Sequence, residues 1–585
     1  MIELEKIQSK CFFRTYDYGV AVKYILILLF LFPSILSSNP LFLSFEGNEN
    51  INERELYKAL GLYKPYAYEF WKKEPTVDSE VASLVGETLK SFYRSKGLYH
   101  TTVTHSEDNT SIHIIIDEKK PVLVADITSA SLLDISSHIP FKKEMIFDAN
   151  KFDKSKKTIQ LLYAENGYCN AKLETKAWVD IETNLAYLMY DVIEGELCYF
   201  GSIEIEPPEN IDSKIIRSLL YIKEKEPYSP EDIRRSYKSL YGYEGISKAI
   251  IDTNTHNKNT VPIKIKVSEN ENPIRFQTGI GASSDEGAMA LLGVKHRNLF
   301  KDLKTLSLST RLTEIKKTIK SNFDMPLKHR NSTGVEIGFE NEKFLGFKEE
   351  RLFGSIYLKQ REMPHMFQES LVFDNSITYE SDDALLFPEG KLFVLSPKLQ
   401  WVYDTRDNLL DPSKGHFLRA DLMGSLESKI SDASYYKYML TGGYIIPIDT
   451  SILALKVDFG SLRIFDGRIP SSYRFYTGGM NSNRAYGYRE LGPVNAQNDP
   501  IGSDSVLETT AEYRFPLYGD FKGVIFNDNT FIGSNEIPDY DQGYYSAGLG
   551  IRYLTPIGPI AIDFGFDIED PQEQYAFHFH IGELF

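Results

Sequence analysis

Three stretches near the end of the 585-residue chain alternate between apolar residues and polar or very small ones: Tyr545-Ser-Ala-Gly-Leu-Gly-Ile-Arg-Tyr553, Ile560-Ala-Ile-Asp-Phe-Gly-Phe-Asp-Ile568 and Tyr575-Ala-Phe-His-Phe-His-Ile581. Successive side chains of a strand point to opposite faces, so each stretch has one apolar and one polar or small face. This is typical of a strand with lipid on one side and a wet lumen on the other. A soluble sandwich also alternates, but its outer face rarely mixes glycine and charge in this way.

The same texture begins near Arg275 and continues along the rest of the chain. We expect eleven strands up to Phe465 and five after it, which gives sixteen, an even number that bacterial barrels allow. The expected strand centres are Ile280, Leu291, Leu308, Ile319, Glu336, Ile356, Val372, Leu399, Ala420, Tyr438, Val457, Ala511, Ile525, Leu549, Ile562 and Phe579. Each strand with its loop then takes about 20 residues, which suits a strand of about 9–11 residues in the membrane. The prediction is a 16-stranded antiparallel transmembrane β-barrel over residues 272–585.

Composition excludes several other classes of protein. The chain has 37 Tyr and 36 Phe, an excess that suits aromatic girdles at both membrane interfaces. The mean hydropathy of -0.29 excludes a polytopic helical membrane protein, and the net charge of -17 argues against nucleic acid as a partner. Gly279-x-Gly281 lies within an expected strand, whereas the glycines of a dinucleotide-binding motif lie in a turn between a strand and a helix, so we exclude that kind of site. No catalytic or phosphate-binding motif is present, and we expect no enzyme activity, no cofactor and no metal site.

The first half of the chain contains a threefold repeat. An apolar residue, a Tyr, three variable residues, a Gly and an apolar residue recur in Phe92–Leu98, Leu162–Tyr168 and Leu240–Ile246. A helical pattern precedes each glycine, which we expect to end the helix in the left-handed conformation. One strand lies ahead of each helical region and two follow it. The repeat predicts three α+β modules with the order strand, helix, helix, strand, strand, over residues 39–121, 122–198 and 199–271.

The N-terminal region resembles an export signal. An apolar run from Tyr24 to Phe32 follows Lys23 and precedes small residues, and it is too short to span a bilayer. We expect residues 1–38 to be a signal with a long leader, cut near Ser37 or Ser38, with a true start nearer Val20. A membrane anchor is the alternative.

Two cysteines remain in the exported chain. Cys11 would leave with the signal, and Cys169 and Cys198 flank an expected hairpin that turns near Glu182. An exported protein allows a disulfide between them. Two separate buried thiols are the interpretation that we favour, and no spacing typical of a metal site occurs.

The module order and the Tyr-x-x-x-Gly signal before each hairpin resemble the POTRA domains of the BamA/TamA outer-membrane assembly superfamily, also known as the bacterial surface antigen family. Two barrel motifs resemble features of the same superfamily. The first hairpin and the periplasmic turn after the second strand are matched by Asp285-Glu-Gly287 and Arg297-Asn-Leu-Phe300. The turn after the eighth strand is matched by Tyr403-Asp-Thr-Arg-Asp-Asn408. Both turns follow even-numbered strands, which places them on the periplasmic side.

The most specific motif lies in the loop after the eleventh strand. The stretch from Arg474 to Tyr488 resembles the superfamily's sixth-loop signature, in which a Val/Ile-Arg-Gly-Tyr/Phe tip folds back into the barrel. Here the tip reads Asn483-Arg-Ala-Tyr486, and Ala485 puts the turn in doubt because alanine tolerates a positive φ poorly. The loop lock implied by the resemblance comprises Arg484, Tyr486, Gly479, Asp528 and Glu512. A guanidinium inside a narrow lumen needs carboxylate partners, because burial of an unpaired charge is costly.

The resemblance covers nearly the whole exported chain and implies a function. Three POTRA units favour the TamA type, the outer-membrane subunit of a translocation and assembly module. It would sit in the outer membrane with its modules in the periplasm, bind a TamB-like protein anchored in the inner membrane, and insert or secrete unfolded clients such as autotransporter-like barrels. A two-partner secretion transporter is the alternative, and an adjacent, very long TamB-like reading frame would favour the first. An ordinary porin would need no POTRA units.

A protein that passes strands into the membrane must expose a strand edge, to which a client strand can pair. We therefore predict a lateral gate where the first strand meets the last. The expected seam residues are Thr278, Gly279, Gly281, Phe577, Phe579 and Phe585, and we expect cysteines near Thr278 and Phe577 to lock the seam.

Overall fold

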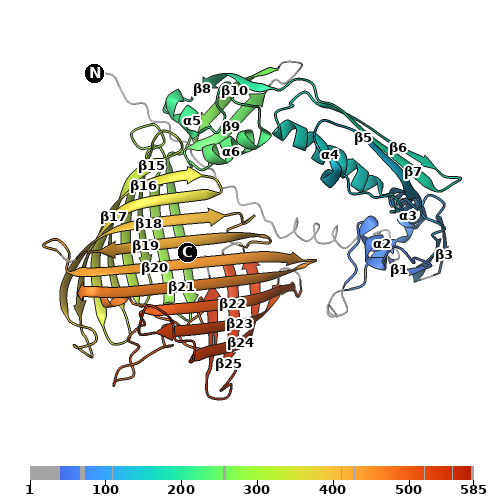
Figure 1. Ribbon diagram of the computed structural model, residues 1–585. Coiled ribbons are helices and arrows are strands. Elements are labelled where there is room, and N and C mark those ends of the chain that lie inside the picture. The colour runs from blue at the N-terminus through green and yellow to red at the C-terminus, as the bar shows by residue number, and fades with distance from the viewer. Residues whose placement is uncertain are drawn as a thin grey trace, which may run out of the picture. The chain divides into compact units, whose positions relative to one another are not determined.

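The computed structural model describes residues 40–65, 73–108, 110–253, 259–409, 411–426, 428–518, 521–555 and 558–581. It contains three small sheets followed in sequence by one closed barrel (Figure 1). The expected signal over residues 1–38 and the seam residue Phe585 lie outside the described residues. Among the helices in these ranges, none combines the length and the apolar character needed to cross a membrane.

The first module is a four-stranded sheet with two helices. Its elements are β1 (Pro40–Glu46), α2 (Glu53–Ala59), β2 (Thr76–Asp78), η1 (Ser79–Val81), α3 (Ala82–Ser95), β3 (Thr102–Glu107) and β4 (Ser111–Asp117). The sheet order is β2-β1-β4-β3, and β1 runs parallel to β4. Leu56 and Leu89 from the helices pack with Ile112 of β4 in its core. Gly97 has a φ of 86°, as expected of a glycine that ends a helix.

The second module departs from the expected helix pair. It consists of β5 (Leu123–Ala130), η2 (Ser136–His138), α4 (Ala149–Glu165), β6 (Lys172–Asp180) and β7 (Leu185–Ile193), with the sheet order β5-β7-β6. The first expected helix is wrong, because only the single 3-10 turn η2 forms there. Asp134 accepts a hydrogen bond from the backbone N–H of Ser136 at 2.9 Å, and Pro140 follows too soon for a longer helix.

The third module has the expected order. It consists of β8 (Tyr199–Glu206), α5 (Ser213–Leu219), α6 (Pro230–Tyr241), β9 (Ile246–Thr253) and β10 (Thr260–Glu269), with the sheet order β8-β10-β9. Ser229 caps α6 by accepting from the backbone N–H of Asp232 at 3.1 Å. The expected left-handed Gly245 is wrong, because α6 ends four residues earlier and Gly245 is not among the positive-φ glycines.

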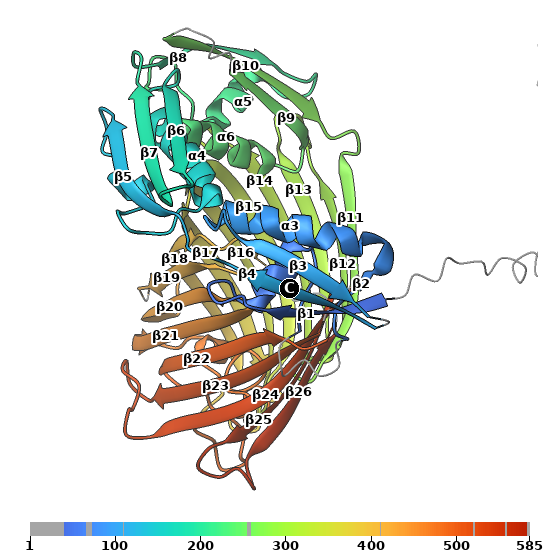
Figure 2. The same cartoon turned by 90° about the vertical axis from the view of Figure 1, so that its right-hand side faces the viewer.

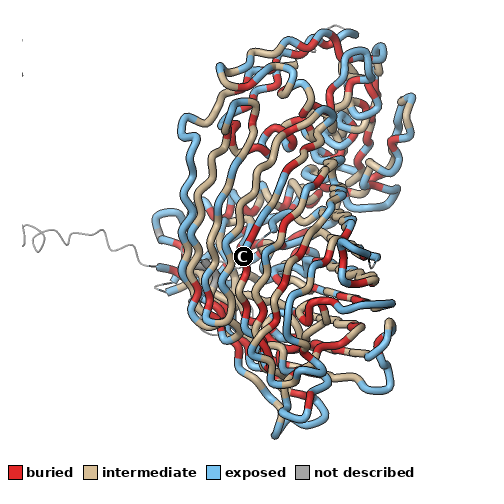
Figure 3. Tube along the Cα trace, turned by 90° about the vertical axis from the view of Figure 1, so that its left-hand side faces the viewer, coloured by how far each residue is buried: buried red, intermediate tan, exposed pale blue. Residues whose placement is uncertain are grey.

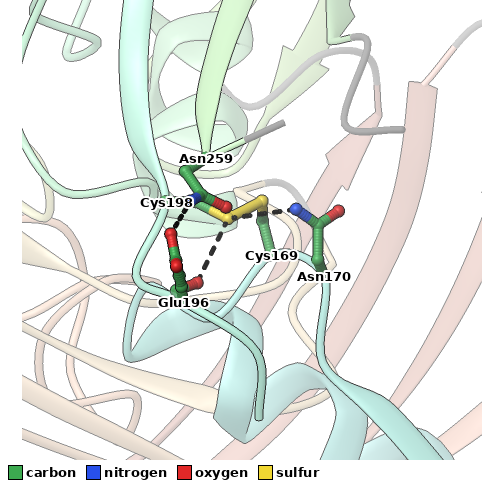
Figure 4. The surroundings of a disulfide bond; sticks show 5 residues. All are labelled: Cys169, Asn170, Glu196, Cys198 and Asn259. Carbon is green, nitrogen blue, oxygen red and sulfur yellow. Dashed lines mark hydrogen bonds between the residues drawn. A yellow bond between two sulfur atoms is a disulfide. The ribbon is translucent and has the colours of Figure 1, made fainter. Parts of the chain in front are cut away.

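Cys169 and Cys198 form a disulfide with an S–S distance of 1.98 Å (Figure 4). The expectation of two separate thiols is therefore wrong. The hairpin of β6 and β7 returns the chain to its starting point, so the residues just before and just after it meet. The backbone N–H of Cys198 donates to the carbonyl of Gly167 at 2.8 Å, and Cys198 belongs to the core of the third module. The bridge therefore ties the end of the second module's hairpin to the first strand of the third.

The barrel has sixteen strands, and each expected centre lies within one of them. They are β11 (Ile274–Ser283), β12 (Gly287–His296), β13 (Thr305–Leu312), β14 (Lys316–Pro326), β15 (Ser332–Lys343), β16 (Lys348–Glu362), β17 (His365–Tyr379), β18 (Gly390–Asp404), β19 (Gly415–Ser425), β20 (Ala433–Ile448), β21 (Ser451–Gly467), β22 (Ser505–Pro516), β23 (Phe521–Gly533), β24 (Gly543–Thr555), β25 (Gly558–Asp567) and β26 (Tyr575–Ile581). Consecutive strands pair antiparallel and β26 returns to β11, so the sheet closes.

Burial along the strands follows the expected alternation. Leu549 and Phe577 are 61% and 59% exposed, whereas Asp563 and His578 are 1% and 2% exposed. Buried positions recur along the barrel strands between exposed and intermediate ones (Figure 3). The apolar side chains therefore form the outer wall, and the polar ones face the interior.

Candidate functional site

The loop between β21 and β22, residues 468–504, folds into the barrel interior and includes the short turn η3 (Ser471–Tyr473). Its Arg484 is only 4% exposed. The loop contacts the inward faces of strands on both sides of the barrel.

Arg484 meets three carboxylates from the barrel wall. Its Nε and Nη2 donate to the two oxygens of Asp528 at 2.8 and 2.9 Å, and its Nη1 donates to Glu512 at 2.8 Å. The third carboxylate, Asp563 of β25, lies 3.4 Å from Nη1. The guanidinium also lies 3.4 Å from the ring centre of Phe526. The structure thus brings together the predicted Arg484, Asp528 and Glu512 and adds Asp563.

Two further arginines balance the charge of this cluster. Arg514 donates to Glu512 at 2.6 Å, and Arg552 donates to Asp563 at 2.5 and 2.8 Å. Removal of charges from water is costly unless each has a partner, and this set satisfies that condition. The alternation of β25 was a usable signal for Asp563, since it lies on the polar face between Ile562 and Phe564.

The tip of the loop forms without the usual glycine. Ala485 is fully buried and does not have a positive φ, so the expected difficulty with alanine does not arise. The carbonyl of Asn483 accepts from the N–H of Tyr486 at 3.3 Å, and the side chain of Asn483 accepts from the N–H of Ala485 at 3.2 Å. The hydroxyl of Tyr486 donates to Asp567 at 2.5 Å. Gly479, with a φ of 102°, donates its N–H to the carbonyl of Tyr486 at 3.1 Å.

A second clamp holds the loop to the opposite wall, and sequence reasoning missed it. The hydroxyl of Tyr473 donates to Asp374 of β17 at 2.9 Å, and the ammonium of Lys437 donates to the carbonyl of Tyr473 at 2.6 Å. Arg489 forms an ion pair with Glu342 of β15 at 2.8 Å. No local motif marks these residues, because their contact depends on the path of the loop across the lumen.

The seam between β11 and β26 is described as far as Ile581, the last residue of β26. Among the described residues it has two pairs, Ala282 with Ile581 and Ser283 with His580, whereas β11 and β12 share ten pairs. Figure 2 shows the first barrel strands beside the last ones. The backbone N–H of Ser284 also donates to the carbonyl of Phe579 at 3.0 Å.

The predicted seam residues are brought together only in part. A Cβ on Gly281 would strike the carbonyl oxygen of Ile581, so this glycine permits the close approach. Among the described residues Thr278, Gly279 and Phe577 have no seam pair; Thr278 and Gly279 pair with β12, and Phe577 pairs with β25. The expected cross-link between Thr278 and Phe577 is therefore wrong, because the register places Ala282 opposite Ile581.

At the barrel end where β11 begins, the third module packs against the turns that follow even-numbered strands. Leu303, in the turn after β12, belongs to the hydrophobic core of the module. The ring of Tyr221 lies between the guanidinium groups of Arg235 and Arg330, at 4.3 and 4.0 Å. Glu362 forms ion pairs with both arginines, at 3.2 and 2.6 Å.

A second polar contact joins the same module to β11 and β12. Glu244 lies 3.2 Å from Arg275, 3.0 Å from Lys295 and 3.4 Å from Arg297. Partial burial alone would raise the pKa of Glu244, but Lys295 and Arg275 more than offset this and hold it below its usual value. A Cβ on the neighbouring Gly245 would lie 2.9 Å from the carbonyl oxygen of Arg297. Gly245 therefore allows the module to approach the barrel closely, and it does not end a helix.

Comparison with known proteins agrees with this architecture. Residues 296–585 match the family described as the Omp85 superfamily domain. The chain belongs to the Omp85 superfamily. Residues 129–195 and 198–270 match the POTRA family, described as a surface antigen variable number repeat. This Omp85 protein is thus an outer-membrane β-barrel with POTRA domains in the periplasm, and the barrel end that contacts the third module is the periplasmic end.

Its relatives include outer-membrane protein assembly factors. The outer membrane protein assembly factor BamA of Nitratidesulfovibrio vulgaris is 21% identical over 579 residues, which cover 92% of this chain and 72% of that protein. The BamA of Neisseria meningitidis is 20% identical, over 93% of this chain and 78% of that protein. The crystal structure of BamA from Haemophilus ducreyi lacking POTRA domains 1–3 matches with a TM-score of 0.55 and 16% identity, over 79% of this chain and 99% of that one. The structural match supports the fold alone.

Proposed function

We propose that this Omp85 protein is an assembly factor that inserts or secretes client proteins, such as other barrels or autotransporter-like proteins, through a lateral gate at the seam. The observation that supports the proposal is a contrast within the described residues, in which two pairs join β11 to β26 and seven join β25 to β26. A strand edge in lipid leaves backbone groups unsatisfied, at several kcal/mol each. An incoming client strand can satisfy them by pairing with the exposed edge.

The loop gives the barrel the rigidity that a gate requires. Arg484 and Tyr473 hold it to opposite walls, so β15 to β17 and β22 to β25 are braced through the lumen. A barrel braced in this way opens most readily where strand pairing is weakest. The seam is that place among the described strands.

The modules provide the periplasmic contacts in this proposal. The first module shares its strand order with the two that match the POTRA family, since its last strand lies between the first strand and the third. We infer that it is a POTRA domain too, that unfolded clients contact the modules, and that the protein is of the TamA type with a TamB-like partner anchored in the inner membrane. Co-purification of the full chain with a TamB-like protein from the same membrane tests the subtype. Absence of such a complex would refute the TamA subtype but would not affect the proposal of a lateral gate.

The decisive experiment locks the seam. Ala282→Cys with Ile581→Cys places two cysteines on the paired positions, and the full chain is reconstituted into lipid vesicles. Phe564→Cys with Phe577→Cys is the matched control, because these residues pair across β25 and β26, away from the seam. Insertion of an unfolded barrel protein is measured under oxidising and then reducing conditions.

We expect oxidation of the seam pair to block insertion and reduction to restore it, while the control pair has no effect. Undiminished insertion through a fully cross-linked seam would refute the lateral gate. Retained secretion of a dedicated exoprotein through the same locked barrel would favour the two-partner transporter in its place.

A further inference from the structure

A cluster of contacts joins the first hairpin, the last strand and the lumen loop at the seam. Asp285 lies in the turn between β11 and β12, and its side chain is 10% exposed. One of its carboxylate oxygens lies 3.3 Å from Nδ1 of His578 in β26. The other accepts a hydrogen bond from the backbone N–H of Met480 in the loop at 3.0 Å. A single carboxylate therefore touches both the last strand and the loop.

His578 likewise contacts both the loop and the turn of the first hairpin. Its Nε2 lies 3.2 Å from the carbonyl oxygen of Arg484, an atom that can only accept, so Nε2 is the donor. Its Nδ1 faces Asp285 and also lies 3.3 Å from the hydroxyl of Ser284. The ring is 2% exposed, so water cannot readily replace these partners.

Two glycines make room for the cluster. A Cβ on Gly479 would lie 2.9 Å from the Asp285 carboxylate, and a Cβ on Gly565 would strike the carbonyl of Arg484. A third contact strengthens the same junction, because the side-chain amide of Gln574 donates to the carbonyl of Ala485 at 2.8 Å. The backbone of the loop tip is thus held against the last two strands.

We propose that Asp285 and His578 form a seam latch, which couples insertion of the loop to closure of the gate. The inference rests on the proposed function. At the seam, His578 belongs to the last strand and Asp285 to the turn after the first, so opening at this end separates them. Each of the two also holds the loop, by the N–H of Met480 or the carbonyl of Arg484. Withdrawal of the loop therefore weakens the seam.

The coupling is reciprocal, as thermodynamic linkage requires. If the inserted loop favours the closed seam, the closed seam favours the inserted loop by the same factor. The latch lies on the outer side of the membrane, because the turn between β11 and β12 follows the first strand and the POTRA domains are periplasmic. A client or loop movement at the outer face could thus open the seam without any contact with the POTRA domains.

The test measures seam closure directly. The Ala282→Cys/Ile581→Cys protein is placed in vesicles, and the rate of disulfide formation with a mild oxidant reports how often the paired positions are in contact. Asp285→Ala and His578→Ala are added singly and together. Asp285→Asn, which keeps the volume and one oxygen acceptor, serves if the alanine variant does not fold. His365→Ala, in β17, removes a histidine from a strand far from the seam in the barrel order.

We expect each latch variant to slow cross-linking about fivefold, the size of effect that loss of a buried hydrogen bond produces. The double variant should be little slower than either single variant, because both remove one connected unit. Arg484→Ala should slow cross-linking as well, since it releases the loop. His365→Ala should leave the rate unchanged, and the Phe564→Cys/Phe577→Cys pair should form its disulfide normally in every latch variant.

Unchanged cross-linking in Asp285→Ala and His578→Ala would overturn the latch, and fully additive effects would overturn the coupling. Client insertion is measured in the same vesicles, which separates the two proposals. A locked seam that still inserts clients refutes the gate, whereas the cross-linking rates still decide the latch. If the locked seam blocks insertion but the latch variants cross-link at the normal rate, the proposal of a lateral gate stands and the proposal of a latch is refuted.

Discussion

The guanidinium of Arg484 faces the carboxylate of Asp528 with both oxygens engaged, at 2.8 and 2.9 Å, in an interior where the two side chains are 4% and 3% exposed. This bidentate pair joins the loop tip to β23. Because both groups are removed from water, loss of either leaves the buried cluster of three arginines and three carboxylates with one uncompensated charge. The geometry therefore makes the pair a determinant of loop position.

We expect Arg484→Ala and Asp528→Ala each to destabilise the inserted loop by about 3–5 kcal/mol, the usual cost of breaking a buried ion pair. The double variant should cost much less than the sum, because it removes both charges of the same pair. Limited proteolysis of the loop over residues 468–504 measures its release, and heat-dependent migration in gels checks that the barrel still folds. Additive defects in the double variant would show that the pairing does not hold the loop.

The opposite clamp gives a separate prediction. Tyr473→Phe removes the hydroxyl that donates to Asp374 at 2.9 Å and keeps the ring over Arg351. A hydrogen bond to a charged acceptor contributes about 1.5–3 kcal/mol, so proteolysis of the loop should become about tenfold faster or more. Tyr357→Phe is a suitable control, since its hydroxyl donates to the carboxylate of Asp324 in the barrel wall at 3.0 Å. Equal protection of the loop in both variants would exclude a role for this clamp.

The strands were predictable because lipid and lumen impose opposite demands on alternate residues. Leu549 and Asp563 occupy the faces that their own strands predict, and no knowledge of distant residues is needed. Arg484 and Asp528 were predictable for a different reason, since a recurring local motif marks them. Asp285 and His578 lie in the quoted motifs as well, but their contact requires the seam register.

The register itself was not predictable from the pattern. A strand alternates equally well in any register shifted by two residues, so Thr278 and Phe577 were as reasonable a seam pair as Ala282 and Ile581. Gly245 shows a related limit. Its place in the repeat predicts a helix stop, but the adjacent barrel turn requires a residue without a side chain at this position.

The disulfide predicts a local loss of stability. Cys169→Ser with Cys198→Ser removes a bridge between residues 29 positions apart. A cross-link of this kind contributes about 2–4 kcal/mol in the usual case. We expect the region around the second hairpin and β8 to exchange amide hydrogens faster in the variant, while the barrel is unchanged. A reducing agent should reproduce the effect in the native chain and add nothing in the variant.

Gly245→Ala tests how the third module meets the barrel. The added Cβ would lie 2.9 Å from the carbonyl oxygen of Arg297 and 2.8 Å from a methyl of Leu303, so one of the two segments must move. We expect faster hydrogen exchange in the turn 297–304 and a loss of about 1–3 kcal/mol, as for other overpacked contacts. Gly86→Ala is the matched control, because its Cβ would meet only His105, at 3.8 Å. Slow exchange retained in the turn of Gly245→Ala would show that the contact is not tight.

The last prediction is a pH dependence of the same contact. The pKa of Glu244 is lowered where the module meets the barrel, since Lys295 and Arg275 stabilise its charged form. A group whose pKa falls when the third module packs against the barrel contributes stability above its undocked pKa, here its ordinary value of 4.5, and loses it as the pH falls through the docked value. The association of the third module with the barrel should therefore be constant near neutral pH and weaken only below about pH 4.5. The effect should be small, because Glu244 is 36% exposed and such ion pairs contribute about 0.2–1 kcal/mol each.

Glu244→Gln separates this contribution from general acid effects. The variant should dock slightly less well than the native chain at neutral pH, and its docking should not weaken further through loss of this charge in acid. Hydrogen exchange of the turn 297–304, measured between pH 3 and 7 after correction for intrinsic rates, reports the difference. Curves that run parallel over the whole range would mean that Glu244 does not titrate with docking. Curves that converge in acid would support it, since protonation removes from the native residue the charge that the variant already lacks.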